Sequence, residues 1–274
     1  MSFNSDKFQM LRYRPSTVPV HLPGYIAYDG SQVRECPAVR DLGVGMTSDA
    51  SFSKHIQDVV NGARDQVSWI LRCFATREAG VMMTLYRALV LPRLEYCSIL
   101  WSPTKAGDIQ ALEGVQRTYT SKISSLSHLD YYGRLKELGL YSVERRRERF
   151  AMLYVFKVIH GLVPNVNEKI MTMRHQRRGL LCVVPRVNAR ASPRVTDAKV
   201  SSFCHRGPAL FNCLPRCVRD IADFDRFKSS VDRFLREVPD EPRAPQYHRR
   251  ASSNSVDDQL AALRADGVYL RGAY

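Results

Sequence analysis

The fold is decided at the stretch Arg40-Asp41-Leu42-Gly43-Val44-Gly45-Met46-Thr47-Ser48-Asp49, where a short extended segment is followed by a long amphipathic helix. Residues before this stretch alternate between apolar and polar side chains, which is typical of strands. Residues after it mostly show apolar side chains three and four apart, which is typical of helices. The sequence therefore predicts a mainly α protein of the α+β class, with its few strands near the N-terminus.

The segment before this stretch contains short strand-like runs. Tyr25-Ile26-Ala27-Tyr28 is followed by Asp29-Gly30, and Gln32-Val33-Arg34 supplies a return strand. Asp-Gly accepts the positive φ angles of a type I′ turn, so this pattern predicts a β-hairpin. A few short strands do not make a stable sheet alone. We therefore expect their partner strands to lie upstream of Met1.

A helix is expected from about Ser48 to Phe74. Its inward stripe consists of Phe52, Ile56, Val59, Ala63, Val67, Ile70 and Phe74. Its charged face carries Lys54, Asp58, Arg64, Asp65 and Arg72. Spacings of three and four along the stripe place one apolar face against a core.

More helices are expected after residue 76. A helix that begins after Thr76 must kink or end at Pro92, because a proline ring clashes with the preceding turn. The segment Leu94–Trp101 is apolar nearly all round and is expected to be the most buried helix of this part. A helix from about Lys105 to Ile123 follows it. Further along, Gly139 ends a short helix and Ser142 caps one that runs to about His160.

Four arginines crowd the start of that last helix: Arg145, Arg146, Arg147 and Arg149. Cations near a helix N-terminus oppose the helix dipole, so another interaction must favour them there. One interpretation is contact with phosphates. Another is an exposed face that is partly neutralised by Glu144 and Glu148. A nuclear localisation signal is weaker, because the glutamates interrupt the basic run.

The segment from Arg174 to Arg206 is strongly basic. It holds eight Lys or Arg against the single acidic residue Asp197, and it contains Pro185 and Pro193. Such segments are disordered or bound to a phosphate backbone, and both can hold at once. An ordered block and a helix with an apolar stripe of phenylalanines follow. The proline- and serine-rich chain from Pro239 onward is expected to be disordered.

Composition narrows the class of protein. The 274 residues contain 41 Lys or Arg against 27 Asp or Glu, for a formal net charge of +14. This excess favours polyanionic partners, nucleic acid or an anionic membrane face. No window approaches the ~18 apolar residues of a membrane span, and the N-terminus lacks a signal peptide. Seven cysteines without secretory targeting indicate free thiols. We therefore expect an intracellular protein, nuclear or cytoplasmic and not secreted.

A zinc site can be drawn from Cys204-His205, Cys213 and Cys217. The spacing argues against it, because structural zinc sites usually place two ligands two to four residues apart on a turn. Buried core thiols are the commoner fate of such cysteines. The sequence contains no P-loop, His-Glu-x-x-His motif or Gly-x-Ser-x-Gly elbow, so no self-contained active site is predicted.

A series of short motifs carries a family resemblance. The motifs are Phe3–Leu11, Arg40–Val44, Ala75–Arg77, Leu91–Pro103, Leu112–Arg117, Leu140–Arg147, Leu210–Pro215 and Val238–Pro242, followed by Ser252–Ser255. In their order and spacing they resemble the last part of the reverse transcriptase of non-LTR (LINE-type) retrotransposons, which are transposable elements. The resemblance covers nearly the whole chain.

The resemblance implies roles for individual residues. Lys7, with Asn4, matches the motif after the catalytic turn, where a palm lysine is thought to protonate the departing pyrophosphate; a surface lysine on a strand is the alternative. Leu42, Gly43 and Val44 match the primer grip. The helices from Ser48 to about Ile123 match the thumb, which contacts backbone phosphates. Candidate nucleic-acid contacts are Lys54, Arg64, Arg72, Arg77, Arg145, Arg146, Arg149, Arg177 and Arg178.

The same resemblance bears on activity. The Tyr/Phe-Ala-Asp-Asp turn and the earlier aspartate that hold two Mg²⁺ ions in this family are absent from the chain. Without those carboxylates the metals that activate the 3′-hydroxyl have no ligands. We therefore expect no metal site and no RNA-directed DNA polymerase activity from this chain alone. Mg²⁺ belongs to the full-length enzyme.

The resulting expectation is a truncated polymerase fragment with four parts. They are a palm remnant with the primer-grip hairpin (1–46), a helical thumb (47–127), a basic helical C-terminal domain (128–238) and a disordered tail (239–274). Its expected partners are RNA and DNA, bound without sequence specificity, and the missing palm and fingers of the same enzyme; no membrane is expected. The alternative is a helical protein-interaction module without a nucleic-acid role.

Overall fold

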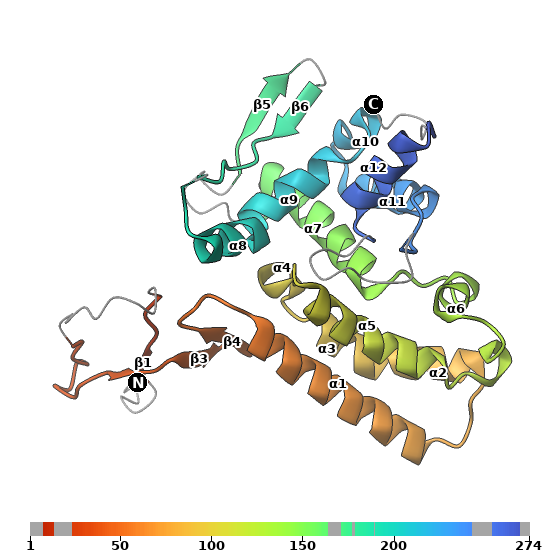
Figure 1. The fold of residues 1–274 in the computed structure, drawn as a ribbon, viewed down its shortest axis with the longest axis horizontal. Helices are drawn as coiled ribbons and strands as arrows, with labels where there is room; N and C mark the ends of the chain where they lie inside the picture. Colours follow the sequence, from red (N-terminus) through yellow and green to blue (C-terminus); the bar gives the residue numbers. More distant parts are fainter. Residues whose placement is uncertain are drawn as a thin grey trace. The chain divides into compact units, whose positions relative to one another are not determined.

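The computed structural model describes residues 8–13, 24–163, 171–176, 179–188, 190–242 and 254–268. The protein is mainly helical with a few short strands, as the sequence predicts (Figure 1). It divides into two compact units, residues 1–58 and 59–274, which are described separately.

Unit 1 contains the strands of the N-terminal segment. Strand β1 (Gln9–Met10) pairs in parallel with β2 (Arg34–Glu35). The expected hairpin between Tyr25 and Arg34 is present, with an antiparallel bridge from Ile26 to Gln32. Its turn is not type I′, because among its residues only Gly30 has a positive φ, of 84°. The N–H of Gly30 instead donates to the Ala27 carbonyl at 3.0 Å, as in a type I turn followed by a left-handed glycine.

A second hairpin follows in unit 1. Strand β3 (Ala38–Asp41) pairs antiparallel with β4 (Val44–Thr47), and Leu42-Gly43 joins them. Helix α1 (Ser53–Cys73) begins in unit 1 and continues in unit 2. The predicted apolar stripe is confirmed for Ile56, Ala63, Val67 and Ile70, which are buried together with Val60. The other predicted members, Phe52, Val59 and Phe74, are half-buried.

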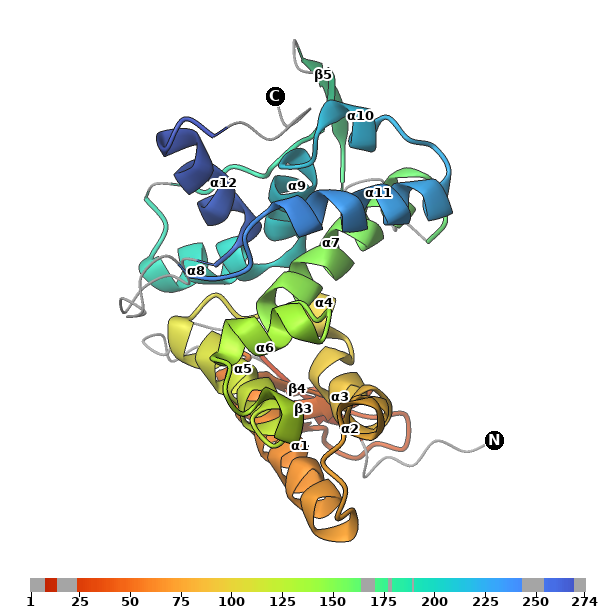
Figure 2. The ribbon, with the colours of Figure 1, turned by 90° about the vertical axis from the view of Figure 1, so that its right-hand side faces the viewer.

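The first helices of unit 2 form a bundle beside the second half of α1 (Figures 1 and 2). The elements are α2 (Ala79–Leu85), the π-helical turn η2 (Tyr86–Val90), α3 (Leu91–Glu95), α4 (Ser98–Trp101), α5 (Ala106–Thr120) and the 3₁₀ turn η3 (Ser124–Leu126). The π-helical turn ends at Val90, two residues before Pro92. A wider turn leaves room for the proline ring and removes the need for its missing N–H.

The expected all-round burial of Leu94–Trp101 is wrong. The helix is interrupted at Tyr96-Cys97, where Cys97 has a φ of 50°. Leu94 and Trp101 are buried, whereas Tyr96 and Leu100 are about half exposed. The apolar residues of this segment therefore face in two directions, since the interruption breaks the helical period.

The rest of unit 2 surrounds one central helix. Its elements are α6 (Tyr131–Glu137), α7 (Val143–Ile159), β5 (Met173–Gln176), β6 (Gly179–Cys182), α8 (Pro193–Ser201), α9 (Phe203–Asn212), α10 (Arg216–Arg219), α11 (Phe224–Glu237) and α12 (Val256–Ala265). Helix α7 packs against both α9 and α11 (Figure 2). The rings of Phe156 and Phe227 stack at 4.3 Å between centroids, and Phe211 adds a third ring at 5.9 Å from Phe227.

The predicted boundaries of α6 and α7 are confirmed. Gly139 follows α6 with a φ of 59°, and the Ser142 hydroxyl caps α7 by accepting from the Arg145 N–H at 3.1 Å. None of the helices in the described ranges is long and apolar enough to cross a membrane.

Two segments expected to be irregular contain regular structure. The basic segment folds into the hairpin β5–β6 and the helix α8. The Asn212 side chain holds the hairpin by exchanging two hydrogen bonds with the backbone of Cys182, at 2.8 and 2.9 Å. The expected disorder from Pro239 is wrong for residues 254–268, since Val256 and Leu260 of α12 are buried in the core. Residues 243–253 and 269–274 lie outside the described ranges.

Candidate nucleic-acid interface

The tip of the β3–β4 hairpin has an unusual backbone. Leu42 has a φ of 44° and Gly43 a φ of 84°, so both lie in the left-handed region that a type I′ turn requires. Glycine adopts this region freely, whereas leucine does so at a cost of about 1–3 kcal/mol. The Leu42 side chain is 82% exposed, although the neighbouring Val44 is buried. The hairpin therefore holds an apolar side chain in water at its tip.

Contacts within unit 1 fix the hairpin to the start of α1. The N–H of Gly45 donates to Nδ1 of His55 at 3.2 Å. The Thr47 hydroxyl donates to the Ser51 carbonyl at 2.7 Å and also contacts Asp49. These bonds lie behind the tip, on the helix side of β4. Strand β4, which follows the tip, is therefore fixed to the start of α1.

The candidate cations of α1 are exposed. Lys54 lies in the first turn within unit 1, and Arg64 and Arg72 lie further along within unit 2. Asp58 and Asp65 are exposed on the same helix. The five charges together sum to +1, so this helix offers separate cations rather than a continuous basic stripe.

Arg77 has a structural role that the sequence did not predict. Its guanidinium donates to the carbonyl oxygens of Leu71 and Thr76, both at 2.8 Å, and of Phe74. These carbonyls lie at and just beyond the end of α1, where no helical N–H is available to them. Arg77 thus caps the helix with three of its donors, which leaves it a poorer candidate for phosphate than Arg64 or Arg72.

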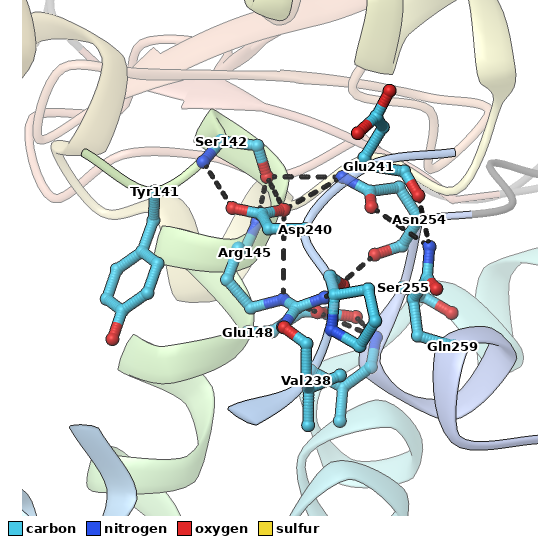
Figure 3. Close-up of polar contacts among 12 residues, drawn as sticks. Tyr141, Ser142, Arg145, Glu148, Val238, Asp240, Glu241, Asn254, Ser255 and Gln259 are labelled. Carbon is cyan, nitrogen blue, oxygen red and sulfur yellow. Dashed lines mark hydrogen bonds and ion pairs between the residues drawn. The ribbon is translucent and has the colours of Figure 1, made fainter. Parts of the chain in front are cut away.

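Arg145 is buried at the start of α7, and its proposed contact with phosphate is wrong. The side chain has 0% exposure. It donates to the carbonyl oxygens of Val238 at 3.2 Å, Pro239 at 2.8 Å and Asn254 at 3.4 Å (Figure 3). The exposed-face interpretation is wrong as well, because the guanidinium is enclosed by segments that follow α11.

Two carboxylates compensate the charge of Arg145. Its Nε lies 3.7 Å from Glu148 and 4.0 Å from Asp240 (Figure 3). Asp240 accepts from the backbone and hydroxyl of Ser142, both at 2.7 Å, and from the Asn254 amide at 2.9 Å. We call the set Ser142, Arg145, Glu148, Asp240 and Asn254 the α7 polar cluster. It ties the chain on both sides of residues 243–253 to the start of α7.

Glu148 also holds the start of α12. Its two carboxylate oxygens accept from the N–H of Val256 at 3.0 and 3.2 Å, next to the N-cap Ser255. Burial and the nearby Glu144 raise the pKa of Glu148 to about 8, although Arg145 lowers it. Glu148 thus contacts both the N-terminus of α12 and the guanidinium of Arg145, and so links α12 to α7.

The other arginines of α7 have partners on different helices. Arg146 pairs with Glu95, and Arg149 pairs with Asp232 through two hydrogen bonds. Both side chains are largely buried, at 24% and 16% exposure. They are therefore not an open basic face, and contact with nucleic acid stays a prediction for them.

Arg147 is fully enclosed without a carboxylate partner among the described residues. Its guanidinium lies 4.2 Å from the centroid of the Trp101 ring, and Nη2 donates to the Leu94 carbonyl at 2.8 Å. Burial and the neighbouring Arg206 lower its pKa to about 9. Apart from Glu148, which lies three residues after Arg145, the partners of the four arginines lie dozens of residues away in the sequence, so local sequence signals could not have identified them.

A buried carboxylate receives the first N–H of α7. Glu113 of α5 accepts from Val143 N at 3.0 and 3.2 Å and from the Tyr131 hydroxyl. Burial raises its pKa to about 7, although those hydrogen bonds lower it. The sequence analysis missed this residue, since an isolated glutamate in a helix has no distinguishing pattern.

The remaining candidate residues are three predicted nucleic-acid or catalytic residues and the cysteines of the possible zinc site. Lys7, Arg177 and Arg178 lie outside the described residues. Cys204 and Cys213 are half-buried and Cys217 is exposed. Burial raises the pKa of the Cys213 thiol to about 12, and its Sγ lies 3.4 Å from the Ala209 carbonyl. Within the described ranges, no group of three His, Cys, Asp or Glu side chains could hold a metal ion.

The chain is distantly similar to a curated protein. A segment of 128 residues is 26% identical to the uncharacterized protein B0403.1 of Caenorhabditis elegans. It covers 46% of this chain and 63% of that protein, so the match spans less than two thirds of the relative. No protein-family model matches the chain, and no solved structure matches it. The name of the relative states no activity, and a likeness at this level does not assign a family.

Proposed function

We propose that this chain binds the backbone of a template–primer duplex, in the way that the primer grip and thumb of a non-LTR retrotransposon reverse transcriptase would. The observation that carries the proposal is the tip of the β3–β4 hairpin, where Leu42 is exposed at a positive φ. Strained residues that the surrounding structure holds in place are concentrated at binding sites. The family resemblance assigns the primer grip to Leu42, Gly43 and Val44, at the same hairpin tip.

Charge supports the choice of nucleic acid. The net charge of +14 attracts polyanions, and Lys54, Arg64 and Arg72 are exposed on α1. Between β5 and β6 the sequence has two more cations, Arg177 and Arg178, which lie outside the described residues. Such cations bind phosphate regardless of base sequence, so binding should be non-specific.

The proposal includes no polymerase activity for the chain alone. The sequence has no Tyr/Phe-Ala-Asp-Asp turn, whose carboxylates would bind two Mg²⁺ ions. Primer extension with Mg²⁺ should therefore show no incorporation, and incorporation above a protein-free control would contradict this part of the proposal.

A hairpin substitution tests the proposal. Leu42→Asp places a carboxylate at the tip, where phosphates would repel it, and should weaken binding of an RNA–DNA hybrid on the order of tenfold in a filter assay. Leu162→Asp is the control, because Leu162 is also an exposed leucine but lies after α7. Equal affinity of the two variants, with circular dichroism showing both folded, would contradict the hairpin contact.

An apolar cavity in unit 1 favours a second candidate, a protein-interaction module. The cavity has a volume of about 710 Å³, and its lining includes Tyr25, Ile26 and Tyr28, each more than 60% exposed. Exposed apolar patches of this kind often mark protein contacts. This candidate predicts association that detergent disrupts and salt does not, which sedimentation of the wild-type and Ile26→Ser proteins would measure.

A further inference from the structure

A groove in unit 2 lies outside the hairpin and the exposed face of α1. Its lining comes from α7, from α11 and from the segment 95–99, which includes the end of α3 and the start of α4. Its volume is about 450 Å³. This falls in the range of about 300–1,000 Å³ that is typical of sites for small organic groups. We call it the α7–α11 groove.

The groove carries uncompensated positive charge. Four charged residues line the groove: two are in ion pairs and, within the described residues, two are not. Arg149 is neutralised by Asp232, and Glu95 is neutralised by Arg146. Lys157 and Lys228 have no carboxylate partner among the described residues. The groove therefore presents two ammonium groups that a pair of phosphates could neutralise.

Aromatic rings make up much of the remaining wall. Phe150, Tyr154 and Phe224 line the groove and are each half-buried. The Lys157 ammonium lies 4.9 Å from the Phe224 ring centroid, so a cation and an aromatic ring lie side by side in the wall. The wall is thus mainly apolar, and Lys157, one of its two lysines, lies beside a ring.

This combination fits an unstacked nucleotide. Proteins that bind single strands place bases against aromatic rings and phosphates against cations, and stacking contributes about 1–3 kcal/mol per base. A duplex cannot use such a wall, because its bases are stacked inside the helix. We propose that the α7–α11 groove binds single-stranded nucleic acid, with a base against the three rings and the backbone against Lys157 and Lys228.

This site goes beyond the duplex contact proposed for the hairpin and does not depend on it. In a protein that engages a template–primer, an unpaired template or a displaced strand would supply the single strand. The observations that carry the groove all lie within unit 2, whereas Leu42 lies in unit 1.

Cys97 provides a direct reporter of occupancy. It is exposed and lies in the wall of the groove, whereas the exposed Cys217 does not line it. The rate of N-ethylmaleimide alkylation at each thiol can be followed by peptide mass spectrometry, with and without an oligothymidylate. At ten times the dissociation constant, a bound strand should slow alkylation of Cys97 by about tenfold and leave Cys217 unchanged.

Variants separate the groove from general electrostatics. Protection of Cys97 should be lost in Lys157→Ala/Lys228→Ala and kept in Lys122→Ala/Lys136→Ala, which removes two exposed lysines elsewhere. It should also be kept in Leu42→Asp, which impairs only the hairpin. The absence of protection in the wild-type protein, or equal protection in the two lysine pairs, would overturn the proposal. The affinity of the Lys157→Ala/Lys228→Ala protein for the RNA–DNA hybrid is measured separately, and it tests the duplex contact of the hairpin independently of the groove.

Discussion

Helices α1 and α7 both carry several cations but use them differently. Arg64 and Arg72 of α1 are exposed, whereas Arg145 and Arg147 of α7 are buried and their neighbours are paired with other helices. The difference follows from their neighbours in space. Cations at the start of α7 oppose the helix dipole, and carboxylates and carbonyls from distant segments compensate them. The comparison teaches that a basic run can hold a fold together as well as bind a partner.

The largest effect is expected at Arg145. Arg145→Met removes the guanidinium and leaves Glu148, Asp240 and three carbonyl oxygens without it. Breaking a buried ion pair from one side costs about 3–5 kcal/mol. The free energy of unfolding, from urea denaturation followed by circular dichroism, should fall by that amount.

Arg147→Met is the matched control, on the same helix and equally enclosed. Arg147 has no carboxylate partner among the described residues, and its Nε and Nη1 have no hydrogen-bond partner. Replacing such a charge by an apolar side chain of similar volume is often neutral. A loss of stability as large as that of Arg145→Met would show that the α7 polar cluster is not what distinguishes the two positions.

The next effect is the pH dependence from Glu113 at the start of α7. Burial raises its folded pKa to about 7, above its ordinary value of 4.5. Folding therefore favours the protonated carboxyl, so its contribution to stability is complete below pH 4.5 and is lost as the pH rises through 7. The loss is on the order of 3 kcal/mol. Glu148, with its raised pKa, acts in the same direction.

Glu113→Gln isolates this contribution. An uncharged amide keeps an acceptor for the Val143 N–H and does not titrate. Urea denaturation from pH 5 to 8 should show a shallower loss of stability in the variant than in the wild-type protein. Parallel curves for the two proteins would contradict the raised pKa of Glu113.

The smallest effect on stability is expected at the exposed arginines of α1. Arg64→Gln and Arg72→Gln should each change the free energy of unfolding by less than about 0.5 kcal/mol. If they contact phosphates, each should also reduce the salt slope of hybrid binding by about 1. Hybrid affinity and salt slope that match the wild-type protein would restrict the interface to other residues.

Local signals predicted much of the helical fold. Ser142 and Gly139 marked the ends of their helices correctly, because capping depends on the residue itself and its immediate neighbours. The apolar stripe of α11, with Phe227, Val231 and Phe234, is buried as its spacing indicates. Periodicity therefore identified the faces that pack.

Features that depend on distant partners could not be predicted. The segment after Pro239 has the composition of a disordered tail, yet Asp240 and Asn254 are held by Arg145 and Ser142, and α12 packs into the core. The left-handed Cys97, which interrupts the helix after Glu95, was likewise not predicted. Of the candidate site, the family resemblance implied a hairpin at Leu42-Gly43, whereas nothing in the sequence indicated the burial of Arg145.

The most direct test of the proposed function is the salt dependence of binding. Affinity for an RNA–DNA hybrid, measured by filter binding between about 50 and 200 mM salt, should fall linearly on a log–log plot, because each neutralised phosphate releases counterions. With several phosphates contacted, the loss should be on the order of 10³-fold. Affinity that is absent or does not change with salt would contradict the account and favour the protein-interaction module.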